Sequence, residues 1–192
     1  MRILYIISIC LVSSLFFSCK DDDDKIDYAW KNANEEAFNA LANNSDYQKA
    51  EIAQGPGYIY YKVLEPATVN DPDSIPKYTS VVRVLYKGRL IDNDGGGNGE
   101  VFDDSSYTPF IFKIDGSNFY LNGGAVQGTP VIAGWQIALQ NMKEGEKWEV
   151  WIPWNLGYGA AKSGRIPGYS TLVFDIKLDK VLQLYPSSKE ES

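Results

Sequence analysis

After residue 58, apolar and polar positions mostly alternate with a period of two, which is the pattern of half-buried β-strands. The runs that show it best are 59–63, 82–90, 110–114, 148–154 and 172–178. Three stretches rich in glycine, proline or asparagine separate these runs and indicate loops or turns, at 70–76, 92–99 and 115–128. This pattern predicts an antiparallel sheet of five or six strands.

One segment breaks the alternation and has helical spacing. Apolar residues recur there in steps of three and four, at Val131, Ile132, Trp135, Ala138, Leu139 and Met142. Thr129 and Pro130 suit a helix start, and Gly145 suits the position after a helix end. A sheet with one apolar face can bury it by wrapping this short helix, which predicts an α+β fold.

Residues 1–19 have the features of an export signal. Arg2 precedes an apolar run at 3–17 that is shorter than the roughly 20 residues of a transmembrane helix. Residues 15–19, Leu-Phe-Phe-Ser-Cys, resemble a bacterial lipobox, although Phe17 is bulkier than the usual small residue. The resemblance implies that Cys19 becomes the acylated N-terminus and anchors the protein in a membrane. A plain secretory signal is the alternative.

Residues 20–57 are predicted to be an acidic tether followed by a helical spacer. Lys20 and four aspartates follow Cys19, and 27–53 is polar with a helical stripe of apolar residues. The helix could instead pack on a partner. The sequence Cys-Lys-Asp-Asp is similar to the surface-export signal of Bacteroidota lipoproteins, so we expect an outer-membrane lipoprotein on the periplasmic side or the cell surface. Residues 185–192 are expected to be a polar tail.

Charge and composition exclude several functions. The net charge of −7 disfavours binding to nucleic acid or to anionic lipid headgroups. The chain has no histidine, which excludes Ser-His-Asp and Cys-His catalysis and imidazole ligation of a metal. Its two cysteines, Cys10 and Cys19, both lie in the leader. We therefore expect no metal, no cofactor and no disulfide in the body.

Several segments, in order along the chain, resemble FKBP-type peptidyl-prolyl cis-trans isomerases. They are Val-Leu-Tyr-Lys-Gly at 84–88, Val-Phe-Asp-Asp-Ser at 101–105, Pro-Phe-Ile-Phe at 109–112, Val-Ile-Ala-Gly-Trp at 131–135, Met-Lys-Glu-Gly-Glu at 142–146, Leu-Gly-Tyr-Gly-Ala at 156–160 and Thr-Leu-Val-Phe-Asp at 171–175. The resemblance implies an isomerase domain at 58–184, in which a twisted half-barrel sheet wraps the helix around a hydrophobic pocket.

The same resemblance implies the site. The Tyr158 hydroxyl and the Ile132 backbone N–H would bond substrate carbonyls, and Trp135 would form the pocket floor. Asp103, the third catalytic residue, would orient either Tyr86 or the twisted carbonyl carbon. The remaining substrate-binding residues would be Tyr86, Phe102, Phe110, Val131, Ile166 and Phe174. By position alone most of the aromatic residues would also suit a core. Asp103 is more informative, because core packing does not explain an acidic residue next to Phe102 in an apolar stretch.

This chemistry needs neither a nucleophile nor a metal. Rotation of an X–Pro bond breaks no bond, and a dry aromatic pocket favours the twisted amide over the more polar planar one. The expected partners are proline-containing exported polypeptides, and tacrolimus-like macrolides could bind the same pocket. The alternatives are a catalytically weak FKBP-fold binding or chaperone module, and a glycan-binding adhesion lipoprotein.

The chain departs from the family pattern at two places near the expected pocket. Gly168 stands where the family usually has a second proline, and the loop from 159 to 170 is about one residue short, which leaves the role of Ile166 open. The segment 115–128 is an insertion just before Val131. It could be a lid, a substrate platform or a disordered insertion.

Overall fold

A computed structural model describes residues 26–67 and 74–182. Its main element is a seven-stranded antiparallel sheet in the order β1-β2-β8-β9-β3-β4, with β5 also paired to β3. The strands are β1 (Gln48–Glu51), β2 (Tyr58–Glu65), β3 (Val81–Leu90), β4 (Val101–Asp104), β5 (Phe110–Lys113), β8 (Lys147–Ile152) and β9 (Leu172–Leu182). The predicted signal peptide, the predicted lipidation site Cys19, the aspartate run and the predicted polar tail lie outside the described residues.

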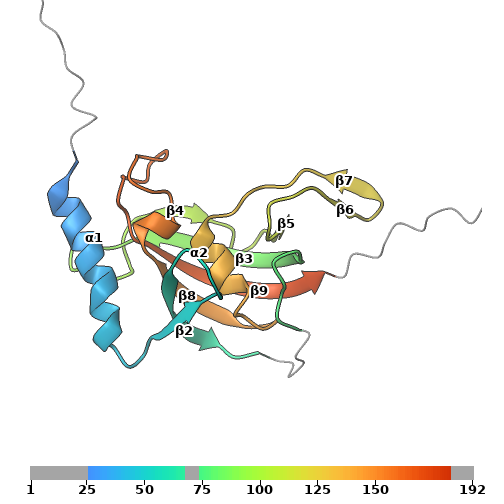
Figure 1. Cartoon of the computed structure of the whole chain (residues 1–192), viewed down its shortest axis with the longest axis horizontal. Coiled ribbons are helices and arrows are strands. Elements are labelled where there is room, and N and C mark those ends of the chain that lie inside the picture. Colours follow the sequence, from blue (N-terminus) through green and yellow to red (C-terminus); the bar gives the residue numbers. More distant parts are fainter. Residues whose placement is uncertain (1–25, 68–73, 183–192) are drawn as a thin grey trace, which may run out of the picture.

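The inner face of the twisted sheet holds the main core, with the short helix α2 (Ala133–Leu139) lying across it (Figure 1). Alternate residues of β3, β8 and β9 point to this face, for example Val84, Val150 and Ile176, and all three are fully buried. A side chain at Gly134 would collide with Ile152, because an added Cβ would lie 2.3 Å from its Cγ2 atom. The glycine therefore lets α2 lie directly on β8.

The predicted α+β fold, an antiparallel sheet wrapped around one short helix, is confirmed, but two details differ. The sheet has seven strands instead of five or six, partly because β1 lies in a segment predicted to be helical. Helix α2 begins at Ala133, since Ile132 has an extended backbone with ψ of 150°. Apolar spacing alone cannot separate a helical residue from an extended one that reaches the same core.

The helix α1 (Tyr28–Ala40), followed by the 3₁₀ turn η2 (Leu41–Asn43), packs on the outer face of the sheet. Phe38 and Leu41 join Tyr60, Trp151 and Val173 in a second core. This differs from the predicted helical spacer, because the apolar stripe of α1 is buried against its own sheet. Strand β1 also pairs with β2 along 48–51, so the folded unit begins before the expected boundary at residue 58.

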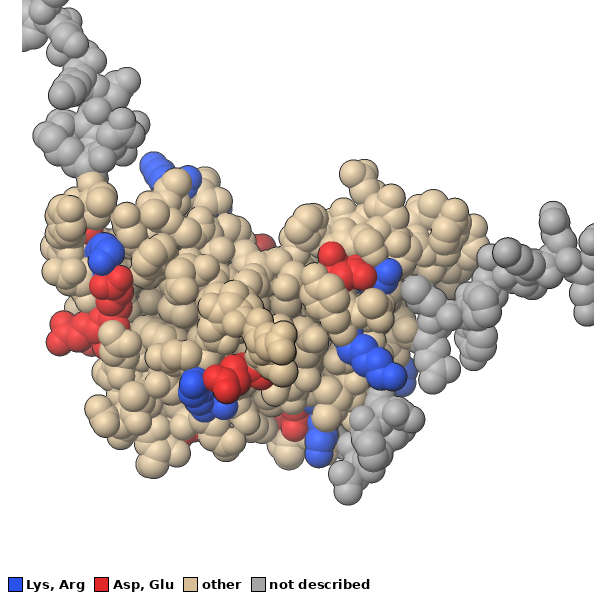
Figure 2. Space-filling view, in the orientation of Figure 1, with Lys and Arg blue, Asp and Glu red and all other residues tan. Residues whose placement is uncertain are grey.

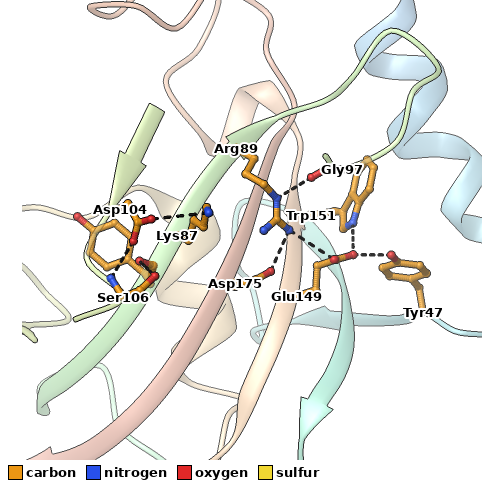
Figure 3. A network of polar contacts seen from close by, with 10 residues as sticks. Tyr47, Lys87, Arg89, Gly97, Asp104, Ser106, Glu149, Trp151 and Asp175 are labelled. Atoms are coloured by element: carbon orange, nitrogen blue, oxygen red, sulfur yellow. Dashed lines mark hydrogen bonds and ion pairs between the residues drawn. The ribbon is translucent and has the colours of Figure 1, made fainter. Parts of the chain in front are cut away.

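The described part of the outer face also carries a partly buried polar network (Figure 3). Arg89 on β3 contacts Asp175 at 2.9 Å and Glu149 at 3.5 Å, and its Nε atom donates to the Gly97 carbonyl at 2.7 Å. Glu149 also accepts hydrogen bonds from Tyr47 and Trp151. The network links β3, β8 and β9 and holds the glycine-rich loop at 92–99.

The insertion at 115–128 forms a hairpin of β6 (Phe119–Leu121) and β7 (Gly124–Val126). Asn122 and Gly123 at its tip have φ of 53° and 81°, which matches the type I′ turn favoured by Asn-Gly. Of the alternatives open from the sequence, the structure excludes a disordered insertion.

We predict that Asn34→Ala on α1 lowers the free energy of unfolding by about 1–3 kcal/mol, because it removes a buried acceptor. Asn34 is fully buried, and its Oδ1 atom accepts the Thr171 backbone N–H at 2.7 Å. Asn32→Ala on the same helix is the control, since Asn32 is exposed. Urea unfolding measures the unfolding free energies of both variants. An equal change in the two would contradict a stabilising role for the hydrogen bond between Asn34 and Thr171.

Candidate active site

A cavity of about 250 Å³ opens between α2 and the inner face of the sheet. Its walls come from β3, β4, β5 and β9, from the segment that leads into α2, and from the loop after β8. The lining residues are Tyr86, Asp103, Phe110, Thr129, Pro130, Val131, Ile132, Trp135, Tyr158 and Phe174. We refer to this cavity as the aromatic cup. Its volume suits a small cyclic group.

Trp135 forms the buried base of the aromatic cup, with a relative exposure of 4%. Its ring meets those of two neighbours nearly at right angles, Tyr86 at a centroid distance of 5.0 Å and Phe174 at 5.3 Å. Edge-to-face packing of this kind fixes ring orientations. The Trp135 Nε1 atom is buried and has no hydrogen-bond partner among the described residues, so ring packing and not a hydrogen bond holds the indole in place.

Polar groups from Tyr86, Asp103 and Tyr158 lie at the wall of the aromatic cup. The Tyr86 hydroxyl donates a hydrogen bond of 2.7 Å to Asp103. Burial raises the pKa of Tyr86 well above its ordinary value, and the bond to Asp103 raises it further. Burial, and then the charge of Asp103, also raise the pKa of the half-exposed Tyr158. Both phenols therefore keep their protons at neutral pH.

A further polar group comes from the backbone. The Ile132 N–H donates to no acceptor among the described residues. Ile132 caps α2 and also lines the aromatic cup. Tyr158 and Ile132 thus provide two hydrogen-bond donors that a bound ligand can use, since neither donates to another described residue.

Two residues expected at the site lie behind the lining. Phe102 on β4 packs edge-on against Phe174, with ring centroids 5.4 Å apart, and so supports the wall from outside. Ile166 is buried in the main core. Its backbone N–H and C=O both pair with Ser163, which makes a tight turn that directs the side chain inward. The other eight expected residues surround the aromatic cup.

Two lining residues, Thr129 and Pro130, are not predicted from the sequence. Their residue types suggest a helix start, but the structure places them at the cavity wall because α2 begins later. The signal that could have identified them is their position between the insertion and Val131, where a chain leaving the hairpin must pass the mouth of the pocket.

A larger groove of about 670 Å³ lies on the outer face, between α1 and the loop at 93–98. Its lining is mostly small or polar, and Trp151 beneath it is buried. Within 26–67 and 74–182, no group of three or more acidic, His or Cys side chains is placed to hold a metal ion. In the same ranges, no helix is long and apolar enough to span a bilayer. The aromatic cup is thus the better candidate for the active site.

Comparison with known proteins gives consistent results. A family model described as FKBP-type peptidyl-prolyl cis-trans isomerase matches residues 73–179. The FKBP-type 22 kDa peptidyl-prolyl cis-trans isomerase of Escherichia coli (strain K12) is 35% identical over 158 residues, which cover 82% of this chain and 59% of that protein. The macrophage infectivity potentiator of Trypanosoma cruzi is 30% identical over 190 residues, covering 90% of this chain and 81% of that protein.

A solved structure also resembles the fold. The crystal structure of a peptidyl-prolyl cis-trans isomerase from Pseudomonas syringae pv. tomato matches with a TM-score of 0.60 and 30% sequence identity. The match covers 81% of this chain and 95% of that one. By contrast, the chain spans only 59% of the length of the Escherichia coli relative, so the likeness to that protein concerns part of it.

We predict that Gly88→Ala disrupts the wall of the aromatic cup. An added Cβ at Gly88 would lie 2.6 Å from the Phe102 ring and 2.7 Å from the Phe174 ring, so both rings must move. Overpacking of this kind costs about 1–3 kcal/mol of stability. Gly124→Ala on β7 is the control, because its nearest atom is 3.6 Å away. Equal unfolding free energies for the two variants would show that the rings are not tightly packed.

Proposed function

The chain belongs to the family of FKBP-type peptidyl-prolyl cis-trans isomerases, and on that premise we propose that the aromatic cup accelerates rotation about X–Pro peptide bonds. The observation that carries the proposal is the buried Trp135, flanked edge-on by Tyr86 and Phe174 beneath an open cavity. A proline ring can lie on the indole while the peptide bond before it stays near the rim.

The chain's contribution is to lower a rotational barrier of about 18–20 kcal/mol. Rotation out of plane removes the resonance that makes the amide polar, so an apolar, water-poor environment favours the twisted state over the planar one. Binding of the substrate's proline ring supplies the energy that holds the substrate in this environment. No covalent bond breaks, so the reaction requires no nucleophile and no general acid or base.

The polar groups at the wall orient the substrate. The Tyr158 hydroxyl and the Ile132 N–H donate to carbonyl oxygens on either side of the proline. These two bonds hold the substrate in place while its X–Pro bond turns. Asp103 holds the Tyr86 hydroxyl at 2.7 Å, which keeps that ring against Trp135. Asp103 thereby acts through Tyr86, and its removal should weaken the reaction rather than abolish it.

The proposed setting is the cell envelope. The leader at 1–19 and the lipobox-like segment that ends at Cys19 support an exported protein whose acylated Cys19 anchors it to the outer membrane, facing the periplasm or the cell surface. Its clients are then exported polypeptides that need proline isomerisation to fold. Labelling cells with radioactive palmitate tests the anchor: Cys19→Ala should abolish incorporation, and continued labelling would contradict it.

A protease-free isomerisation assay on X–Pro peptides tests the activity. We expect the purified chain to raise the exchange rate above the uncatalysed rate, and tacrolimus to inhibit it by occupying the aromatic cup. Rates equal to the uncatalysed ones with several residues before proline would overturn the enzymatic function. Retained binding of proline peptides without acceleration would instead favour a catalytically weak binding module.

We predict that Asp103→Ala lowers kcat/KM about fivefold, because one typical hydrogen bond contributes about 1 kcal/mol net. Asp104→Ala is the matched control on the same strand. Its side chain alternates to the other face, where it contacts Lys87 at 3.7 Å and accepts from Ser106. We expect less than about a twofold change there, because exposed pairs contribute little. Equal losses in both variants, measured in the same assay, would contradict the role of Asp103.

A further inference from the structure

The β6–β7 hairpin is continuous with the rim of the aromatic cup. Thr129 and Pro130, which line the cavity, follow β7 along the chain after two residues. The hairpin then projects from the α2 side of the sheet, at the opposite end of the molecule from α1 (Figure 1). A polypeptide that places its proline in the cup must cross this rim, so its flanking residues can reach the hairpin.

The hairpin has a well-defined shape. The Gly128 N–H donates to the Asn118 side chain at 2.8 Å, which closes the base. Gly116 and Gly128 approach so closely that an added Cβ on Gly128 would lie 2.1 Å from the Gly116 oxygen. Phe119 is buried and anchors one face. Its neighbour Tyr120 points to the other face, where 67% of it is exposed.

Two segments at this end of the molecule contain no charged side chain. Residues 116–142 and 105–112 contain no Asp, Glu, Lys or Arg, although these make up 22% of the chain. Figure 2 shows the corresponding area free of blue and red, apart from the base of the hairpin. Asp103 is the one charged side chain among the cavity-lining residues, and it accepts the Tyr86 hydroxyl. A charged client segment would therefore lose its hydration here without gaining a partner.

The exposed groups that remain suit an extended, uncharged polypeptide. Tyr120 lies opposite Ala125 in the hairpin register, so an open aromatic ring stands beside a small side chain. Tyrosine of this kind is enriched in protein contacts. Strands β6 and β7 pair with each other and with no third strand among the described residues. Their outer edges thus offer backbone groups to an added strand.

We propose that the β6–β7 hairpin is a second contact surface for the client polypeptide, and that it favours prolines flanked by uncharged segments with aromatic or apolar side chains. The inference rests on the proposed function of the aromatic cup and deepens it. The aromatic cup binds the proline itself, and the hairpin contacts the client residues that flank it.

The test compares two substrates that share the same central X–Pro sequence, a tetrapeptide and a longer peptide extended on both sides by uncharged residues. We expect Tyr120→Ala to lower kcat/KM for the longer peptide about threefold to tenfold and to leave the tetrapeptide rate unchanged. Tyr28→Ala is the control, since Tyr28 is 65% exposed and lies on α1, far from the hairpin (Figure 1).

A second pair of variants isolates the charge. Ala125→Glu and Ala125→Gln add side chains of similar size beside Tyr120, and only the first adds a charge. We expect the glutamate to lower kcat/KM for the longer uncharged peptide and the glutamine to preserve it. Gly116 and Gly128 lie close together, so residues 117–127 can be deleted and the two glycines joined. If the hairpin contacts the longer peptide, this deletion should lower kcat/KM for the longer peptide and leave that for the tetrapeptide unchanged.

The outcomes separate the two proposals. Equal losses on both peptides, or equal effects of Ala125→Glu and Ala125→Gln, would overturn the hairpin surface while leaving the isomerase intact. If the full chain accelerates neither peptide, the isomerase proposal fails. Fluorescence anisotropy of a labelled, proline-free version of the longer peptide then decides the hairpin alone: weaker binding to the Ala125→Glu variant than to the Ala125→Gln variant supports it, and equal binding contradicts it.

Discussion

The structure depends on the edge-on packing of Trp135 against Tyr86 and Phe174. These three rings come from α2, β3 and β9, so their contact joins the helix to the two longest strands of the sheet. Trp135 also lines the open cavity. One set of contacts therefore contributes to folding and forms the candidate active site.

Two glycines allow this packing. Gly134 brings α2 down onto β8, and Gly88 leaves room for the rings of Phe102 and Phe174 above β3. On the outer face, α1 and the network around Arg89 hold the same strands from behind. The aromatic cup is thus supported on both sides of the sheet, which suits a site that must keep its shape while a substrate bond rotates.

Much of this was predictable from the sequence. Period-two alternation identified the central strands, and the helical spacing around Trp135 identified α2. The seven motifs then indicated the residues that gather at the cavity.

The errors have physical causes. The apolar stripe of α1 does not reveal what covers it, and here the covering surface is the protein's own sheet. The start of α2 was placed too early because extended residues at 131–132 contact the same core. The family resemblance places Ile166 at the pocket, with its role left open by the short loop, whereas its pairing with Ser163 turns it inward.

The central claim is that a proline ring lies on Trp135, and fluorine NMR of the chain labelled with 5-fluorotryptophan tests it directly. The chain has five tryptophans, and the signal missing from Trp135→Phe assigns the one of interest. We expect an added proline peptide to shift the Trp135 signal and to leave that of Trp151, on the outer face, unchanged. A shift of Trp151 with no change at Trp135 would contradict it.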